Sequence, residues 1–141
     1  MIVRPWEKGD TEKVNIQEAQ SYMQGAPEMS ADFSALSEIG LAWTFDNDGE
    51  ILGIAVILPQ WENRAVMVAL MSENAGPHFH KIHKAALRFV KACGIRRLEA
   101  VVDVGFDAGE RWVKMLGFRH EGLMKAYRPD GADMNLFARV Q

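Results

Sequence analysis

The sequence is poor in several features that define specialised classes of protein. It holds a single cysteine, Cys93, so no disulfide can form within the chain, which fits a reducing cytoplasm. The formal net charge is −3, so no basic field attracts a nucleic-acid backbone. The longest apolar run, "ILGIAVIL", is too short to span a membrane, and the N-terminus lacks the apolar core of a signal peptide. We therefore expect a cytoplasmic protein that binds neither nucleic acid nor membranes.

The composition is that of an ordinary folded domain. Hydrophobic residues make up 48% and charged residues 25% of the 141 positions, which is typical of globular rather than disordered chains. A chain of this length buries a core without disulfides or a structural metal. No repeat or low-complexity linker divides it, so residues 1–141 are predicted to form a single domain.

The first forty residues predict one strand and two helices. "MIVRP" is typical of a short strand that a proline ends, and "GDTEKVNIQEAQSYM" predicts a helix that begins near Asp10 or Thr11. "SADFSALSEIG" predicts a second helix, with Ser30 as its N-cap and Gly40 as its stop.

From Leu41 the pattern changes from helical to alternating. "LAWTFD" and "EILGIAVIL" predict two strands, and the Asp-Gly pair between them is a hairpin signal. A turn over Pro59–Asn63 precedes a third strand, "RAVMVALM". Three consecutive strands joined by short turns indicate an antiparallel meander.

The second half alternates helices and strands. "GPHFHKIHKAALRFVKACG" predicts an amphipathic helix that ends at Gly94, and "RRLEAVVDV" an inner strand. "DAGERWVKMLGF" predicts a short helix capped by Asp107 with Glu110 three residues on, and "RHEGLMKAY" with "DMNLFARV" a last hairpin. The order predicts an α/β domain with a mixed sheet of about six to seven strands.

This element order, the break between the third meander strand and a helix opened by a glycine loop, and the later "KMLGF" together resemble the GNAT superfamily of acyl-CoA-dependent N-acetyltransferases. The best-matching stretch is "GIRRLEAVVDVGFDAGERWVKMLGFRHEG", and "ERWVKMLGF" followed by "PDG" is most similar to small acetyltransferase-like proteins of tailed phages and prophages. The resemblance implies a GNAT-like fold with an N-terminal antiparallel meander and helices on both faces of the sheet. It implies transfer of an acetyl group from acetyl-CoA to an amine of unknown identity, in a bacterial host cell, with virion association and a homodimer left open.

In this family acetyl-CoA lies in a splay between two strands, and backbone N–H groups at a helix start hold its pyrophosphate, as a helix N-terminus favours anions. The family signature is Arg or Gln, two residues, Gly, one residue, then Gly or Ala; Glu73, Gly76 and His78 stand at these positions. Only Gly76 keeps the signature, and Pro77 removes one N–H donor. The resemblance assigns the acetyl-CoA site to Met71, Ser72, Gly76, Pro77, His78, Phe79, His80 and Lys81.

Two other interpretations of this stretch stay open. Gly76 as a cap with Pro77 at the first helical position is a frequent helix start without any ligand. His78, His80 and His83 suggest a metal site, but "HFHKIH" lacks an acidic partner and the chain offers no second cluster of ligands. We expect no metal.

Acetyl transfer needs a proton acceptor for the amine and a proton for the departing thiolate. Glu73 and Asp103 follow strands, where α/β folds place ligands, and are the candidate bases; loop or capping carboxylates are the plainer interpretation. In the family a late-helix Tyr gives the proton, but Val113 stands there, so Tyr127 is the nearest candidate. The departures at Glu73, Pro77 and Val113 favour the alternative of a catalytically inactive GNAT-like protein, a virion component or host-interaction module, or one that binds CoA for regulation.

Overall fold

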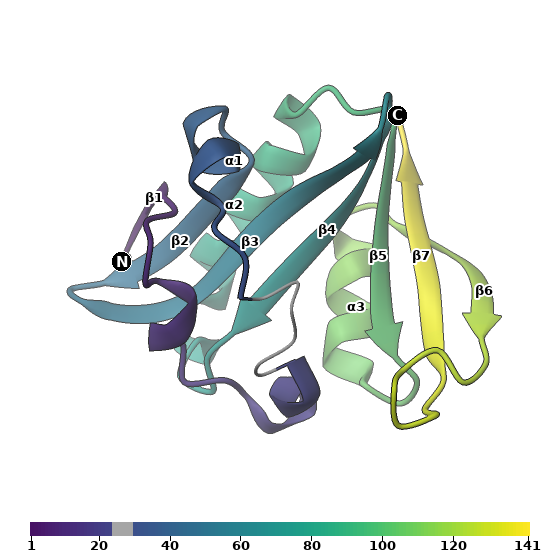
Figure 1. Cartoon of the computed structure of the whole chain (residues 1–141). Coiled ribbons are helices and arrows are strands. Elements are labelled where there is room, and N and C mark those ends of the chain that lie inside the picture. Colours follow the sequence, from purple (N-terminus) through teal and green to yellow (C-terminus); the bar gives the residue numbers. More distant parts are fainter. Residues whose placement is uncertain (24–29) are drawn as a thin grey trace. The chain divides into compact units, whose positions relative to one another are not determined.

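A computed structural model describes residues 1–23 and 30–141 and contains one seven-stranded mixed sheet (Figure 1). The strand order is β1-β2-β3-β4-β5-β7-β6. The strands are β1 Ile2–Pro5, β2 Ala42–Asn47, β3 Glu50–Trp61, β4 Arg64–Met71, β5 Arg97–Asp103, β6 Arg119–Met124 and β7 Met134–Val140. The helices are α1 Ser34–Glu38, α2 Phe79–Ala92 and α3 Asp107–Met115, with 3-10 turns η1 Thr11–Lys13, η2 Glu18–Met23 and η4 Gly76–His78. The α/β fold and its strand count are confirmed.

The chain divides into two compact units. The first unit holds Met1–Leu58 with Val68–Cys93, and the second holds Pro59–Met67 with Gly94–Gln141. None of the helices in the described residues has the length and apolarity needed to cross a membrane.

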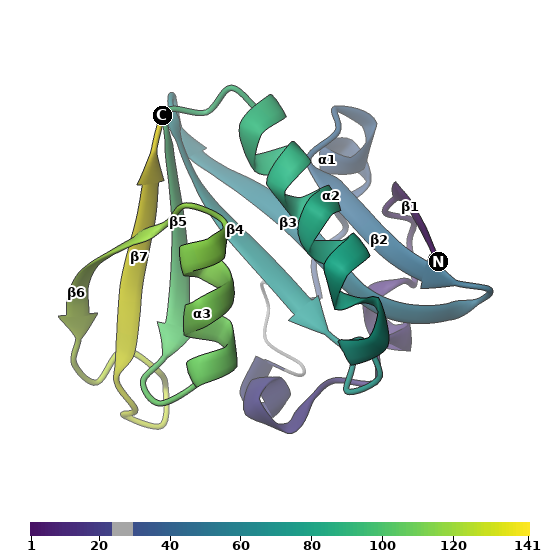
Figure 2. The ribbon, with the colours of Figure 1, turned by 180° about the vertical axis from the view of Figure 1, so that it is seen from behind.

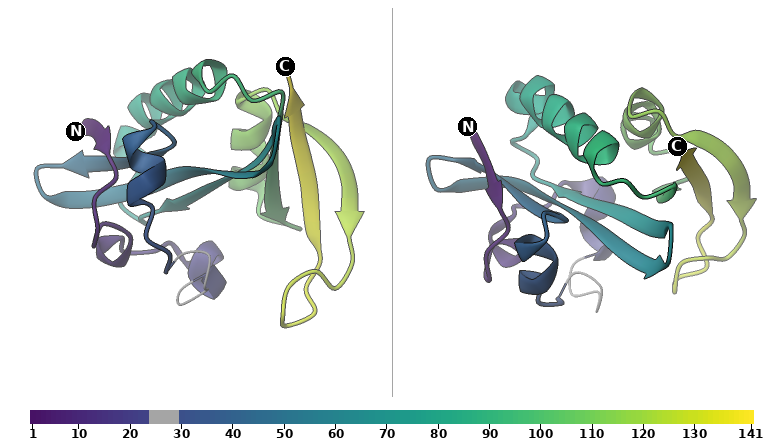
Figure 3. Two further views of the ribbon diagram at one scale, coloured as in Figure 1. Left: turned by 45° about the horizontal axis from the view of Figure 1, so that its top comes forward. Right: turned by 90° about the horizontal axis from the view of Figure 1, so that it is seen from above.

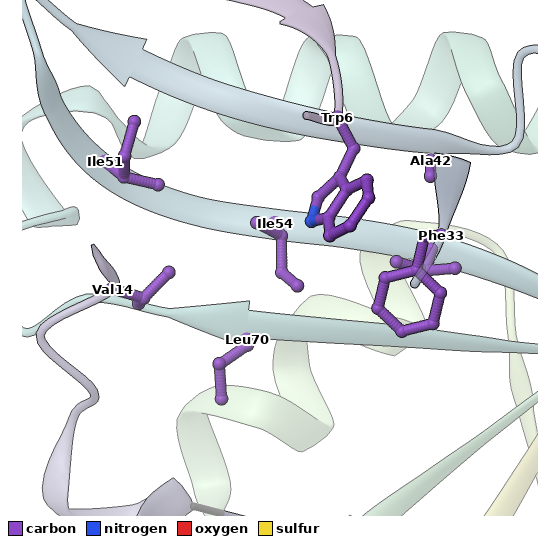
Figure 4. Close-up of a cluster of buried hydrophobic side chains, with 8 residues drawn as sticks. Trp6, Val14, Phe33, Ala42, Ile51, Ile54 and Leu70 are labelled. Atoms are coloured by element: carbon purple, nitrogen blue, oxygen red, sulfur yellow. The ribbon is translucent and has the colours of Figure 1, made fainter. Parts of the chain in front are cut away.

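The first unit is an antiparallel arrangement of β1, β2 and β3 with the end of β4, covered by α2 on one face and α1 on the other (Figure 3). The predicted hairpin between β2 and β3 turns at Asp48 and Gly49, both with positive φ (50° and 94°), as a tight hairpin requires. A buried cluster lies on the α1 face (Figure 4) and comprises Trp6, Val14, Phe33, Ala42, Ile51, Ile54, Val56 and Leu70.

Helix α2 covers the other face of this unit (Figure 2). Its buried residues are Ile82, Ala85, Ala86 and Val90, spaced as an amphipathic helix requires. The Phe89 ring stacks on Trp43 with centroids 3.7 Å apart and planes 6° apart. Gly94, with φ of 71°, ends the helix as predicted.

The predicted helix over Gly9–Met23 is wrong. Two short 3-10 turns stand there, and between them Ile16 pairs antiparallel with Ser72. The physical reason is anchoring: Asp10, 2% exposed, accepts hydrogen bonds from Arg4 and from the Thr44 hydroxyl. These contacts fix the chain just before the segment, and the pairing with Ser72 outweighs a weakly amphipathic helical pattern.

The predicted turn over Pro59–Asn63 is also wrong in extent, since β3 runs to Trp61 and the turn is at Glu62 and Asn63. Pairing of β2 with β3 begins at Val56, and the Ile57 N–H donates to the Leu41 carbonyl. Pro59 is the next residue on that edge of β3, beyond the described pairing with β2. Its missing N–H therefore removes no bond of the ladder.

Two predicted caps are corrected. Ser30 does not cap α1; the Asp32 carboxylate accepts the Ser34 N–H at 2.9 Å instead. Asp107 is the first residue of α3, and the cap position belongs to Phe106, with no side-chain cap hydrogen bond. A carboxylate in the first turn still interacts favourably with the helix dipole.

The second unit holds the start of β4, β5, β6 and β7. β4 pairs with β5 in parallel over three residue pairs, and β7 pairs antiparallel with both β5 and β6. Helix α3 packs on β5 (Figure 2). Leu98, Leu116, Phe118 and Phe137 are buried in this unit. The predicted last hairpin and its turn at Gly131 (φ 83°) are confirmed.

Candidate functional site

One edge of β4 changes its partner along the strand. Backbone groups of alternate residues point to the same edge of a strand. At the start of β4, in the second unit, Asn63 C=O accepts the Arg97 N–H at 3.0 Å and the parallel ladder with β5 ends at the pair Val66 and Glu99. The same edge continues into the first unit at Ala69 and Met71, where its groups meet a different segment of the chain.

That segment is residues 15–20, which we call the N-terminal strap. Its backbone pairs with the end of β4, because the Gln17 N–H donates to Met71 C=O at 3.1 Å and the Glu73 N–H donates to Asn15 C=O at 3.0 Å. On the opposite edge the Ser72 N–H donates to Leu52 C=O of β3 at 2.8 Å. The end of β4 is therefore hydrogen-bonded on both edges.

A side-chain amide completes this pairing. Gln20 Nε2 donates to Ala69 C=O at 2.8 Å, and Gln20 Oε1 accepts the Met71 N–H at 2.9 Å. Gln17 Nε2 also donates to Gln20 Oε1 at 2.9 Å, which orients the carboxamide. A single side-chain amide thus bridges a carbonyl and an N–H two residues apart, as the N–H and C=O of one residue in a parallel neighbouring strand do.

The loop after β4 carries Ser72 and Glu73. Ser72 is 4% exposed, and its hydroxyl oxygen accepts the Asn74 N–H at 3.0 Å. Glu73 is exposed, and its carboxylate accepts a hydrogen bond from Asn15 Nδ2 at 2.8 Å. The acidic side chain at this position is thus held by a neutral donor of the strap.

The start of α2 is a 3-10 turn rather than a single open helix end. The His78 N–H donates to Ala75 C=O at 2.9 Å, and the Phe79 N–H donates to Gly76 C=O. These two N–H groups are used within the chain, which leaves the first-turn residues His80 and Lys81 as the donors without an α-helical partner. Gly76 has open space at its Cβ position, so the fold itself does not require glycine there.

The three histidines do not form a cluster. His80 is exposed, while His83 is partly buried and lies beside the Phe79 ring, with centroids 6.1 Å apart. The buried Nδ1 of His83 makes no hydrogen bond to the described residues. Across residues 1–23 and 30–141, no group of three His, Cys, Asp or Glu side chains is arranged to hold a metal ion.

In the second unit Asp103 ends β5 and is engaged by a cation. Arg128 Nη1 donates to Asp103 Oδ1 at 2.7 Å, and its Nη2 donates to Asp130 at 2.6 Å. The hydrogen bond to Asp103 raises the pKa of Arg128, although desolvation opposes it. Tyr127, which precedes Arg128 in the chain, is 57% exposed.

A second ionic cluster, which we call the clamp, lies at the start of the β4–β5 ladder and consists of Glu99, Arg64 and Arg97. Glu99, 7% exposed, accepts hydrogen bonds from Arg64 at 2.8 and 2.9 Å and from Arg97 at 2.7 Å, and Arg97 also reaches Glu121. The two arginines lie opposite each other in the ladder, so the carboxylate offsets their repulsion. The Arg64 hydrogen bond is the largest influence that lowers the pKa of Glu99 to about 2.

No sequence pattern pointed to a role for Gln17, Gln20 or Arg128. Gln20 meets β4 across 49 and 51 residues of sequence, and Arg128 meets Asp103 across 25. Only the resemblance to the family indicated a site at the end of β4. No pattern within "NIQEAQ", the sequence of the strap, predicts which backbone groups of β4 the strap covers.

Solved structures share this fold over nearly the whole chain. The acetyltransferase (GNAT family) from Bacillus anthracis is 17% identical with a TM-score of 0.65, covering 98% of this chain and 93% of that one. A ribosomal-protein-alanine N-acetyltransferase from Brucella melitensis (14%, TM-score 0.75) covers 100% of both chains, and Ard1 from Thermoplasma volcanium (16%, 0.76) covers 99% and 96%. No family model and no curated protein matches the sequence. The chain has the α/β fold of the GNAT acetyltransferases.

Proposed function

We propose that this protein transfers an acetyl group from acetyl-CoA to an amine. The observation that supports the proposal is the full-length likeness of its fold to acetyltransferases, which covers at least 93% of each chain compared above. Fold alone does not determine chemistry, so the residues must also suit the donor.

The end of β4 suits the pantetheine arm of acetyl-CoA in one respect. That arm carries amide groups, and Ala69 C=O with the Met71 N–H already bind an amide, that of Gln20. An extended amide chain could form the same two bonds in its place. The adjoining Ser72 and the loop residues Gly76, Pro77, His78 and Phe79 belong to the proposed donor site by position.

The start of α2 suits the phosphate groups. The first-turn N–H groups of His80 and Lys81 lie at the positive end of the helix dipole. Lys81, Lys84 and Arg88 are exposed along the helix and add positive charge. Glu73, which is exposed nearby in sequence, opposes this attraction, so we expect weaker donor binding than in family members with Arg or Gln at that position.

The donor supplies an activated thioester, and this chain must accept a proton from the attacking amine. Glu73 and Asp103 are the proposed acceptors, directly or through water. Asp103 Oδ1 already accepts a hydrogen bond from Arg128, whereas Glu73 is exposed and bound by a neutral amide, which makes Glu73 the more available of the two. A thiolate is a weak base and can leave with a proton from water, so Tyr127 is proposed only as an auxiliary donor.

The setting of this activity is proposed on the sequence resemblance. The acceptor is an amine of open identity, in the cytoplasm of a bacterial cell, and phage or prophage origin with virion association comes from "ERWVKMLGF" and "PDG". Three further points stay predictions: a single catalytic domain over residues 1–141, a homodimer, and the absence of nucleic-acid, membrane and metal partners.

Titration calorimetry of the purified chain with acetyl-CoA tests the proposal. We expect saturable binding, and release of free thiol when a panel of primary amines is added. Lys81→Ala should weaken acetyl-CoA binding, whereas the matched control Lys8→Ala, an exposed lysine outside the proposed site, should not. Absence of binding at millimolar acetyl-CoA would contradict the proposal and favour a GNAT-like fold without catalysis.

A further inference from the structure

The strap occupies groups that any ligand paired along the end of β4 would need. Backbone N–H and C=O groups at a strand edge must be satisfied by a partner or by water. At Met71 both groups are taken, the N–H by Gln20 Oε1 and the C=O by the Gln17 N–H, and Ala69 C=O is taken by Gln20 Nε2. A ligand paired there and the strap exclude each other.

The strap is held chiefly by hydrogen bonds, not by burial. None of the residues of η2 is buried, and Asn15, Glu18 and Ala19 are exposed. Ile16 and Met23 are only partly buried against the core. Segments with little buried apolar surface open at low free-energy cost, because water can replace their hydrogen bonds.

The chain just before the strap is firmly fixed. Trp6, Thr11 and Val14 are buried, and the Trp6 Nε1–H donates to the Thr11 hydroxyl at 3.1 Å. Asp10 holds Arg4 by two hydrogen bonds of 2.8 and 3.0 Å. We call these buried residues and the Arg4–Asp10 pair the anchor. Release of the strap can begin after Val14 while the anchor stays folded.

We propose that the strap is a built-in competitor of the acyl donor: Gln20 occupies the amide-binding edge of β4 in the resting protein, and donor binding requires the strap to leave. This inference rests on the proposed function. It predicts that the affinity for acetyl-CoA equals the intrinsic affinity of the open edge multiplied by the open fraction. Any change that weakens the strap without altering the edge must raise the affinity.

Two variants at Gln20 test this in the full-length chain. Gln20→Ala removes both side-chain bonds to β4, and we expect the dissociation constant for acetyl-CoA to fall about tenfold, equivalent to about 1.4 kcal/mol. Gln20→Glu keeps the shape and the acceptor for the Met71 N–H but sets a carboxylate oxygen against Ala69 C=O, so the strap is weakened and the affinity should rise here too. Glu18→Ala, at an exposed position of the same turn, is the control and should leave the affinity unchanged.

Hydrogen exchange provides a readout that does not depend on acetyl-CoA. The Met71 amide should exchange faster in Gln20→Ala than in the wild-type protein, while the amides of α2 keep their protection, which shows that the fold is intact. Tighter acetyl-CoA binding together with faster Met71 exchange supports the inference.

The contrary outcomes separate the two proposals. Equal or weaker acetyl-CoA binding by Gln20→Ala, with measurable binding by the wild type, overturns the competition and leaves the proposed function standing. Binding by neither protein, despite faster Met71 exchange, overturns the proposed function, and the competition falls with it. Unchanged Met71 exchange overturns the role of Gln20 whatever the affinities are.

Discussion

The two ends of β4 satisfy the same strand edge in different ways. At the start, main-chain groups pair with β5, and the Glu99 carboxylate accepts hydrogen bonds from both Arg64 and Arg97. At the end, the partner is the strap, and one of its contacts is a side-chain amide, that of Gln20. A strand ladder backed by a buried ionic clamp cannot open without loss of the sheet, whereas a polar strap can exchange with solvent or ligand. The first end is built for stability and the second for exchange.

The largest effect should come from breaking the clamp. Glu99→Gln removes the carboxylate that Arg64 and Arg97 share, and loss of one member of a mostly buried ionic group costs about 3 kcal/mol of unfolding free energy. Chemical denaturation at neutral pH measures it. Glu121→Gln is the matched control, because Glu121 is exposed and its one ionic partner among the described residues is Arg97, and it should cost about 0.5 kcal/mol. Equal losses in both variants would contradict the clamp.

Acid should break the same clamp in the wild-type protein. The pKa of Glu99 is lowered to about 2, so its contribution is fully present above pH 4.5 and is lost as the pH falls toward 2. By linkage, a pKa lowered from 4.5 to about 2 corresponds to about 3 kcal/mol of unfolding free energy. Other carboxylates titrate in the same range, so the measured quantity is the difference between wild type and Glu99→Gln across pH 5 to 2. That difference should shrink with acid; a constant difference would argue against the lowered pKa.

The fold was largely predictable from the sequence, and the reason is local. The hairpin at Asp48 and Gly49, the stop at Gly94 and the amphipathic pattern of α2 each follow from neighbouring residues. The strap was not predictable, since the helical pattern over Gly9–Met23 was overridden by contacts of Asp10 with Thr44 and of Ile16 with Ser72. Long-range pairing decides the structure of such a segment, and the helix propensities of its single residues do not encode that pairing.

In the candidate site, too, local features could be predicted from the sequence and long-range contacts could not. The position of a site at the end of β4 came from the resemblance and stays a prediction. The hydrogen bonds that occupy Met71, and the Arg128 guanidinium on Asp103, connect residues 25 or more apart in sequence. Their geometry depends on the folded backbone, so no local motif encodes them.

The anchor that precedes the strap offers a third test. Burial tends to raise the pKa of Asp10, but hydrogen bonds from Arg4, Thr44 and the Glu7 N–H outweigh it and hold the pKa below its ordinary value. Asp10→Asn keeps the shape but loses the charge beside Arg4, and should cost about 2 kcal/mol of unfolding free energy. Thermal or chemical denaturation measures the loss. Asp46→Asn, which removes one Arg4 contact near the surface, should cost less, and the reverse order would contradict the anchor.

The smallest effect separates the main chain of the strap from its side chains. Gln17 contributes a backbone N–H to Met71 C=O and, through Nε2, a bond to Gln20 Oε1. Gln17→Ala keeps the first bond and removes the second, so it should cost about 0.5 kcal/mol of unfolding free energy, against about 1 to 2 kcal/mol for Gln20→Ala, which removes two bonds to β4. Amide exchange at Met71 should accelerate slightly in Gln17→Ala and strongly in Gln20→Ala. If the two variants accelerate it equally, the orientation of the Gln20 carboxamide by Gln17, and not its own bonds to β4, controls how readily the edge opens.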